Sequence, residues 1–190
     1  MTVTPSPWTS PSPNAVGRIL IQLALPILDA LGNSDLQTAR RLSNLPLTPY
    51  IATECARVWK MRAVQIRGDP EDAAWVTRLL ITSDGTVVGR AGFHGRPDAT
   101  GMVEVGYSID PQHRRQGHAR AALAIMIEMA RNDPSVRTLR ATVAPDNVAS
   151  RTLIESFGLK EVGEQWDEED GLEIIFEVGC DVAPEEGRLI

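Results

Sequence analysis

The chain has 190 residues, of which 43% are hydrophobic and 23% charged, and this suits one globular domain with a sizeable core. Its 19 Lys and Arg against 25 Asp and Glu give a net charge of −6, which disfavours a general binder of nucleic-acid backbones. Cys55 and Cys180 are too few for a disulfide framework, so we expect a cytoplasmic protein. The apolar run 19–28 is too short to span a bilayer, which needs ~20 residues, so no membrane partner is expected.

The start of the chain is rich in proline. Residues 1–14 hold four prolines among Ser and Thr. Because proline lacks an amide N–H and fixes φ, we predict an extended, disordered tail there, with Trp8 exposed. A single domain is predicted for 15–180, followed by a polar C-terminal tail at 181–190.

Hydrophobic spacing predicts helices first and strands afterwards. Apolar residues recur at helical spacing on both sides of Gly32-Asn33, within 23–43, and again over 51–67. The pattern then becomes β-like. The predicted later elements are strands at 75–82, 86–94, 102–110 and 136–143, helices at 117–132 and 147–157, and a final strand pair within 161–178. This order indicates an α/β (α+β) domain with a mixed, mostly antiparallel sheet.

The most informative segment runs from a strand into a short loop and then at once into a helix. Arg114, Arg115 and Arg120 make the loop basic, and Gly117 stands at the helix start. Free backbone N–H groups and the positive end of the helix dipole make such a helix start a phosphate-binding element. Local positive charge on an acidic chain therefore indicates a phosphate site, with an ordinary surface loop as the alternative.

This loop resembles a motif of the GNAT superfamily of N-acetyltransferases. Arg114-x-x-Gly117-x-Ala119, after a strand that ends in Asp110-Pro111, is similar to the motif that binds the diphosphate of acetyl-CoA in that family.

A second motif follows at the expected separation. Segment 143–150 and then Phe157-Gly158-Leu159 resemble the strand-Asn-helix element of the same family, in the form typical of the branch that contains the ribosomal-protein N-terminal acetyltransferases. The resemblance extends over about 23–178. It is specific for the fold and the cofactor and says nothing of the acceptor.

The resemblance implies a GNAT-like fold with helices on both faces of the sheet and a V-shaped splay between the fourth and fifth strands. Acetyl-CoA would be the co-substrate, and its pantetheine arm would lie between 102–110 and 136–143. A strand kink there would free an N–H group for the thioester carbonyl, as an oxyanion hole. The residues implied in cofactor binding are Tyr107, Ile109, Arg114, Arg115, Gln116, Gly117, His118, Ala119, Arg120 and Asn147. The side chain of Tyr107 falls in the apolar register and is predicted to lie in the core.

Glu104 is the candidate general base. It alternates with apolar residues along 102–110, so it lies on the polar face of its strand. A carboxylate at a cleft suits proton transfer from an ammonium nucleophile, and the resemblance supports this role because related enzymes often use a Glu there. The alternatives are that Glu104 faces solvent or pairs with Arg90.

Ser150 is the candidate group for the departing thiolate. Many members of the family carry a Tyr on the helix after Asn147, but Ile154 occupies that position here. Ser150 lies one turn earlier on the same helical face, from which it would reach the sulfur. The alternative is helix capping together with Asn147, and both roles can hold at once.

His94 ends the strand that pairs with 102–110 and should lie near Glu104. It is a candidate substrate contact or second base, and a loop histidine without a special role is the alternative. His113 and His118 lie beside the basic loop without a third ligand, so no metal site is expected.

These residues predict one function, the transfer of an acetyl group from acetyl-CoA to a primary amine. Since neither cysteine lies in the predicted site, we expect direct attack in a ternary complex without an acyl-enzyme. The acceptor would be a small-molecule or peptide amine, and a homodimer is compatible with the sequence. A non-catalytic acyl-CoA-binding module would keep the loop 114–119 and need neither Glu104 nor Ser150, and an interaction protein without a ligand is the third possibility.

Overall fold

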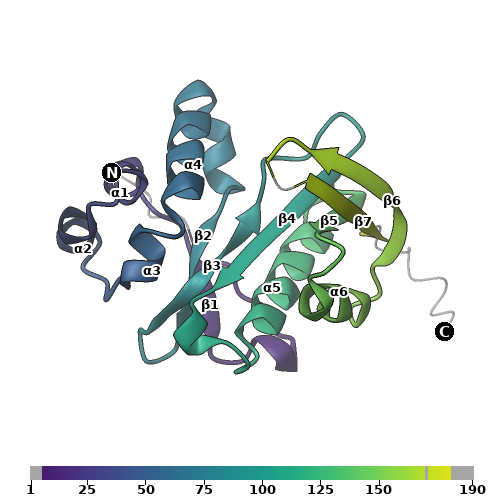
Figure 1. Cartoon of the computed structure of the whole chain (residues 1–190), viewed down its shortest axis with the longest axis horizontal. Helices are drawn as coiled ribbons and strands as arrows, with labels where there is room; N and C mark the ends of the chain where they lie inside the picture. Colours follow the sequence, from purple (N-terminus) through teal and green to yellow (C-terminus); the bar gives the residue numbers. More distant parts are fainter. Residues whose placement is uncertain (1–5, 170, 181–190) are drawn as a thin grey trace, which may run out of the picture.

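A seven-stranded sheet forms the centre of the computed structural model, which describes residues 6–169 and 171–180 (Figure 1). The strands are β1 (Arg18–Ile21), β2 (Arg78–Thr82), β3 (Val87–Phe93), β4 (Met102–Ile109), β5 (Thr138–Val143), β6 (Lys160–Asp167) and β7 (Gly171–Gly179). The α-helices are α1 (Leu25–Gly32), α2 (Leu36–Ser43), α3 (Pro49–Ala52), α4 (Ala56–Gly68), α5 (His118–Asn132) and α6 (Val148–Glu155), and the short 3-10 helices are η1 (Pro13–Ala15), η2 (Pro70–Ala74) and η3 (Pro111–His113).

Two hydrophobic cores lie on opposite faces of this sheet. Side chains alternate along β2, so Leu79 and Ile81 pack with α1–α4, whereas Leu80 packs with α5 and α6. The predicted α/β fold with helices on both faces is therefore confirmed. Within the described residues, every helix is too short or too polar to cross a membrane.

The sheet parts between β4 and β5. The strand order is β1-β2-β3-β4-β5-β7-β6, and β4 and β5 are its parallel pair. They pair over only three residues, from Met102 opposite Thr138 to Glu104 opposite Arg140. On its other side, β5 pairs with β7 over its whole length. The two strands therefore diverge beyond Glu104, and the predicted splay between the fourth and fifth strands is confirmed.

The single helix predicted for 51–67 is replaced by the two helices α3 and α4. The hydroxyl of Thr48, just before α3, donates to Asp110 at 2.8 Å, and the hydroxyl of Tyr50 contacts that of Ser108. These contacts fix α3 against the end of β4 and the residue that follows it, so tertiary contacts override the continuous helical pattern of the sequence.

Strand β1 was not predicted from the sequence, and Trp8 lies elsewhere than predicted. The backbone of Trp8 exchanges hydrogen bonds with that of Leu20 in β1, at 2.9 and 3.0 Å. Its indole is 6% exposed, lies 5.3 Å from the Phe93 ring, and has the guanidinium of Arg78 3.8 Å from its ring centroid. The prediction that Trp8 is exposed is wrong, because burial against the sheet removes a large apolar ring from water. Residues 1–5 of the predicted N-terminal tail, and all of 181–190, lie outside the described residues.

Replacing Trp8 with Ala tests whether the N-terminal segment belongs to the domain. Because Trp8→Ala removes a buried indole, we expect the free energy of unfolding to fall by about 3 kcal/mol in chemical denaturation. Val16→Ala is the control, since that side chain is 66% exposed, and it should change this free energy by less than about 0.5 kcal/mol. Equally small effects of the two substitutions would contradict the burial of Trp8.

Candidate active site

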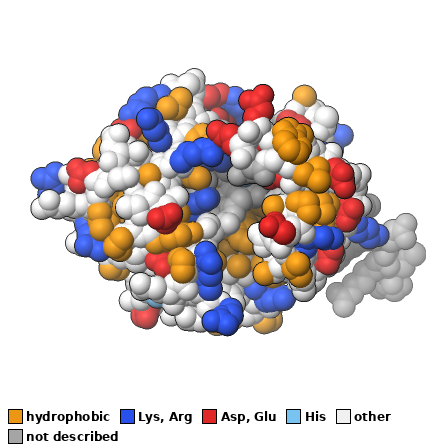
Figure 2. Space-filling model, viewed as in Figure 1, with side chains coloured by type: hydrophobic (Ala, Val, Ile, Leu, Met, Phe, Trp, Pro, Cys, Tyr) orange, Lys and Arg blue, Asp and Glu red, His pale blue; other side chains and the backbone are white. Residues whose placement is uncertain are grey.

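A cleft of about 830 Å³ opens where β4 and β5 diverge. Its walls come mainly from β4, the 113–120 segment, β5 and the start of α6, and Figure 2 shows the molecule hollowed near the middle of the view. The predicted site residues that line it are His94, Tyr107, Ile109, Arg114, Arg115, Gly117, His118, Ala119, Arg120, Asn147 and Ser150. Glu104 and Gln116 do not line it.

The backbone N–H and C=O groups of successive residues in β4 point alternately toward β3 and toward β5. The amide of His94 donates to the carbonyl of Glu104 at 2.8 Å, and the amide of Asp110 donates to the carbonyl of Val88 at 3.0 Å. Because hydrogen-bonded pairs alternate in an antiparallel ladder, the even-numbered residues of β4 bond to β3. The odd-numbered residues direct their N–H and C=O groups toward β5, where pairing ends after Glu104.

This edge of β4 can bind an extended ligand. Val105, Tyr107 and Ile109 all line the cleft. The carbonyl of Ile109 accepts a hydrogen bond from Nε of Arg114 at 3.2 Å, which ties the strand to the basic loop. The pairing of Glu104 with Arg140 engages the N–H of Val105, so the C=O of Val105 and the backbone groups of Tyr107 remain as the open edge of β4 toward the cleft.

Gly117 begins α5 in a left-handed conformation. Its φ is 81°, that of Arg115 is 60°, and Gly117 has no side chain with which to cap the helix. The first backbone bond of the helix joins the amide of Ala121 to the carbonyl of Gly117 at 2.9 Å, so the amides of 118–120 precede it. A Cβ at position 117 would meet nothing within 4 Å, so the φ value and not crowding explains the glycine.

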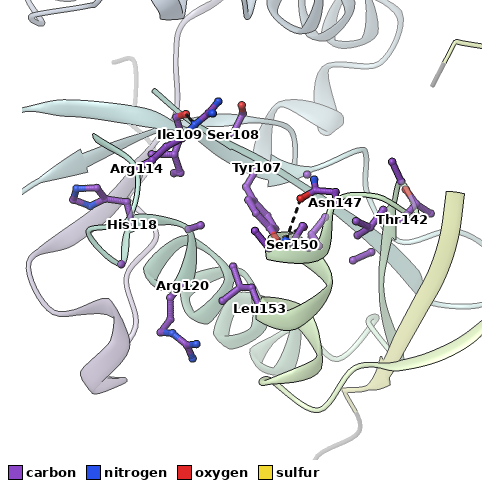
Figure 3. A pocket seen from close by; sticks show the side chains of 18 of the residues that line it. Tyr107, Ser108, Ile109, Arg114, His118, Arg120, Thr142, Asn147, Ser150 and Leu153 are labelled. Atoms are coloured by element: carbon purple, nitrogen blue, oxygen red, sulfur yellow. Dashed lines mark hydrogen bonds between the residues drawn. The ribbon is translucent and has the colours of Figure 1, made fainter. Parts of the chain in front are cut away.

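Arginines surround this helix start. Arg114, Arg115 and Arg120 are exposed and line the cleft, and Figure 3 shows Arg114, His118 and Arg120 around the first turn of α5. Charged donors and unbonded helix amides are the groups that suit an anion such as a diphosphate, and here they gather on a chain whose net charge is −6.

Arg18 of β1 holds the loop in place. Its Nη2 donates to the carbonyl of Gln116 at 3.3 Å, and its Nε donates to Nδ1 of His118 at 3.4 Å. Burial, together with Arg18 and His113, lowers the pKa of His118, so this imidazole is neutral at neutral pH. No local pattern in the sequence could reveal this contact, because 98 residues separate Arg18 from Gln116.

Tyr107 reaches from β4 to α6. Its hydroxyl lies 2.7 Å from Oγ of Ser150, and Figure 3 shows the ring pointing toward the start of the helix. Burial raises the pKa of Tyr107, and the hydrogen bond with Ser150 acts against that rise. Tyr107 packs against the core as a partly buried side chain, in the predicted register. In addition, its hydroxyl meets a polar partner that only the fold brings near.

Asn147 caps helix α6, and Ile154 anchors the same helix in the core. The side-chain oxygen of Asn147 accepts the amide of Ser150 at 3.2 Å, so Asn147 caps the helix and lines the cleft as well. Ile154 is completely buried in the core. Because Ile154 lies in the core, the hydroxyl groups at the start of α6 come from the Tyr107–Ser150 pair.

Glu104 lies beside the cleft with fixed neighbours. Its Oε1 accepts the hydroxyl of Thr142 in β5 at 2.8 Å and lies 3.5 Å from Nδ1 of His94. The carboxylate is 20% exposed, so it does not simply face solvent. His94 was expected near Glu104, and the structure confirms this placement.

Glu173 and Ser108 line the cleft although neither was predicted from the sequence to belong to the site. Glu173 of β7 accepts Nε2 of Gln165 in β6 at 2.9 Å, and Ser108 contacts Tyr50 of α3. Neither pair belongs to a sequence motif. A strand with alternating polar and apolar residues has the same sequence pattern whether its polar face meets solvent or a ligand.

Neither cysteine belongs to the cleft, whereas His113 and His118 both line it. Cys55 and Cys180 are buried, one in each hydrophobic core, and neither lines the cleft. In the described part of the chain, no group of three or more His, Cys, Asp or Glu side chains could hold a metal ion.

Comparison with known proteins agrees with this geometry. A family model described as "Acetyltransferase (GNAT) domain" matches residues 28–160. The uncharacterized N-acetyltransferase YjdG of Bacillus subtilis (strain 168) is 27% identical over 139 residues, which cover 70% of this chain and 80% of that protein.

Solved structures share the fold. The ribosomal-protein-S5-alanine acetyltransferase of Vibrio fischeri matches with a TM-score of 0.62 at 15% identity, over 87% of this chain and 94% of that chain. Mycobacterium smegmatis RimJ, in complex with CoA-disulfide, matches with a TM-score of 0.62 at 19% identity, over 92% of this chain and 86% of that chain. With the family model covering more than half of the sequence, the chain belongs to the GNAT family and is an acetyl-CoA-dependent N-acetyltransferase.

Proposed function

We propose that the acceptor is a primary amine, which attacks the thioester of acetyl-CoA directly while both substrates are bound. Membership of the GNAT family supplies the general activity, acetyl transfer from acetyl-CoA to an amine. The observation that carries the finer proposal is the cleft between β4 and β5, which has an anion-binding helix start at one end and the Tyr107–Ser150 pair in its wall.

The residues of the cleft fit acetyl-CoA. The amides of 118–120 and the dipole of α5 hold the diphosphate, and the surrounding arginines neutralise its charge. The free edge of β4 at Val105 and Tyr107 binds the amides of the pantetheine arm, as an added strand would. An N–H group of the same edge stabilises the negative charge that develops on the thioester oxygen.

Tyr107 and Ser150 serve the leaving group. When the C–S bond breaks, its electron pair goes to sulfur, and the hydroxyl of Ser150 donates a proton to it. Tyr107, 2.7 Å from Ser150, replaces that proton. This relay supplies what a lone serine lacks, since an unassisted aliphatic hydroxyl is a poor acid.

The side chains available support direct attack. Neither cysteine lines the cleft, and the hydroxyl of Ser150 is bonded to a phenol rather than to a base that would activate it as a nucleophile. The amine therefore reacts with the thioester itself.

The acceptor is proposed to be a small-molecule or peptide amine, and a panel test identifies its class. Thiol release from acetyl-CoA is measured with polyamines, amino acids, aminoglycosides and peptides that begin with alanine. The peptide arm is included because the Vibrio fischeri protein is named for an alanine of ribosomal protein S5. If acetyl-CoA binds and none of these amines releases thiol, a non-catalytic acyl-CoA-binding module becomes the better reading.

Gly117→Glu tests the diphosphate site. A side chain at φ 81° strains the loop, and the new carboxylate repels the diphosphate. We expect isothermal titration calorimetry to detect no acetyl-CoA binding by this variant, and acetyl-CoA to raise the melting temperature of the wild type but not that of Gly117→Glu. Gly85→Glu, at a similar φ of 85° in the β2–β3 turn, is the matched control and should bind normally. Normal binding by Gly117→Glu would refute the placement of the diphosphate.

Tyr107→Phe and Ser150→Ala test the proton relay. Each should lower kcat by about 10²-fold with the amine chosen from the panel, without weakening acetyl-CoA binding. Because the two hydroxyls act in one chain, the double variant should be no worse than the slower single variant. Ser156→Ala, at the other end of α6, is the control. An unchanged kcat in Tyr107→Phe would remove Tyr107 from the relay.

A further inference from the structure

His94 enters the cleft from the end of β3. Its amide bonds to the carbonyl of Glu104 at 2.8 Å, and its side chain, 48% exposed, lines the cleft. The side chains of even-numbered β4 residues share one face of the strand, where Ser108 meets Tyr50 of α3. His94 lies on this face, opposite to that of Tyr107.

The imidazole of His94 lies over Gly106. A Cβ built on Gly106 would come within 2.8 Å of Nε2 of His94, closer than such contacts allow. Gly106 stands between Val105 and Tyr107, whose backbone groups face the cleft. Nε2 therefore lies beside the strand edge along which the thioester would bind.

Glu104 and Thr142 orient this imidazole. Oε1 of Glu104 is fixed by the hydroxyl of Thr142 at 2.8 Å and lies 3.5 Å from Nδ1 of His94. A carboxylate at Nδ1 favours the tautomer that carries its proton there. The lone pair of Nε2 is then free on the side of Gly106.

We propose that His94 is the general base that takes the proton from the attacking amine, and that Glu104 is the positioning residue that holds its imidazole. This inference rests on the proposed function and replaces Glu104 as the direct base. The amine nitrogen forms the C–N bond, the C–S bond breaks with its electron pair going to sulfur, and the amine proton moves to Nε2. Ser150 supplies the proton for sulfur, and solvent restores His94 and Tyr107 to their starting states.

The surroundings of His94 favour its neutral imidazole, which is the form that can accept a proton. Burial lowers its pKa, Glu104 of β4 opposes that shift, and Arg62 of α4 and Arg90 of β3 add to it. Arg62 also donates to the carbonyl of His94 at 2.9 Å. With a pKa below the ordinary value of 6.5, the imidazole is neutral at pH 7, so activity should fall as pH drops through that lowered pKa.

Nitrogen-15 NMR of the imidazoles tests the arrangement without any acceptor. The chain has only three histidines, and His94→Gln identifies the signals of His94. We expect the proton of neutral His94 on Nδ1, a pKa below 6.5, and a further fall of this pKa in Glu104→Gln, because the carboxylate stabilises the charged form. Glu128→Gln, on α5, is the carboxylate control. A proton on Nε2, or no effect of Glu104→Gln, would overturn the positioning role.

Kinetics with the amine chosen from the panel tests the catalytic role. His94→Gln should lower kcat/KM by about 10²-fold or more and abolish its dependence on pH below neutrality. Glu104→Gln should shift that dependence to lower pH, and Gly106→Ala should reduce kcat by displacing the imidazole. Calorimetry should show normal acetyl-CoA binding by His94→Gln. Normal turnover in His94→Gln refutes this inference alone, whereas failure of the wild type to bind acetyl-CoA refutes the proposed function.

Discussion

Pairing between β4 and β5 ends after Glu104, and this leaves backbone groups unpaired in the middle of a seven-stranded sheet. A buried N–H or C=O group without a partner costs about 1–3 kcal/mol, so such an edge is stable only where water or a ligand reaches it. The structure meets this constraint by opening a cleft there. β5 keeps its own ladder with β7, and the bond between Tyr107 and Ser150 ties the free part of β4 to α6. The basic helix start of α5 then lies at the cleft because it follows β4 directly in the chain.

The pleat of β4 separates two kinds of chemistry. Tyr107 points toward α6 and Ser150, while Glu104 and Gly106 belong to the face shared with His94. A proton donor and a proton acceptor can therefore lie close to one thioester without neutralising each other. The backbone of β4 between these two faces supplies N–H groups. One strand therefore positions the proton donor, the proton acceptor and the backbone donors of the proposed reaction.

Much of the fold could be predicted from the sequence, because long segments carry clear periodicity and the loop before α5 has a recognisable residue order. β1 escaped notice since its four residues merge with the apolar run that continues toward α1. Trp8 was misjudged because neighbouring prolines suggested a tail, whereas a ring contact with Phe93 decides its position. At the site, the register placed Tyr107 on the correct face but could not reveal the hydroxyl of Ser150. That contact spans 43 residues and depends on the angle at which α6 leaves β5.

Strand β1 contacts both the N-terminal segment around Trp8 and the loop before α5. Trp8 is bonded to Leu20 of β1, and the same strand carries Arg18, which holds Gln116 and His118. An affinity tag that weakened the bonds between Trp8 and Leu20 would, through Arg18, also disturb the loop that we propose to bind the diphosphate. Preparations intended for quantitative work on acetyl-CoA should therefore have such a tag cleaved off.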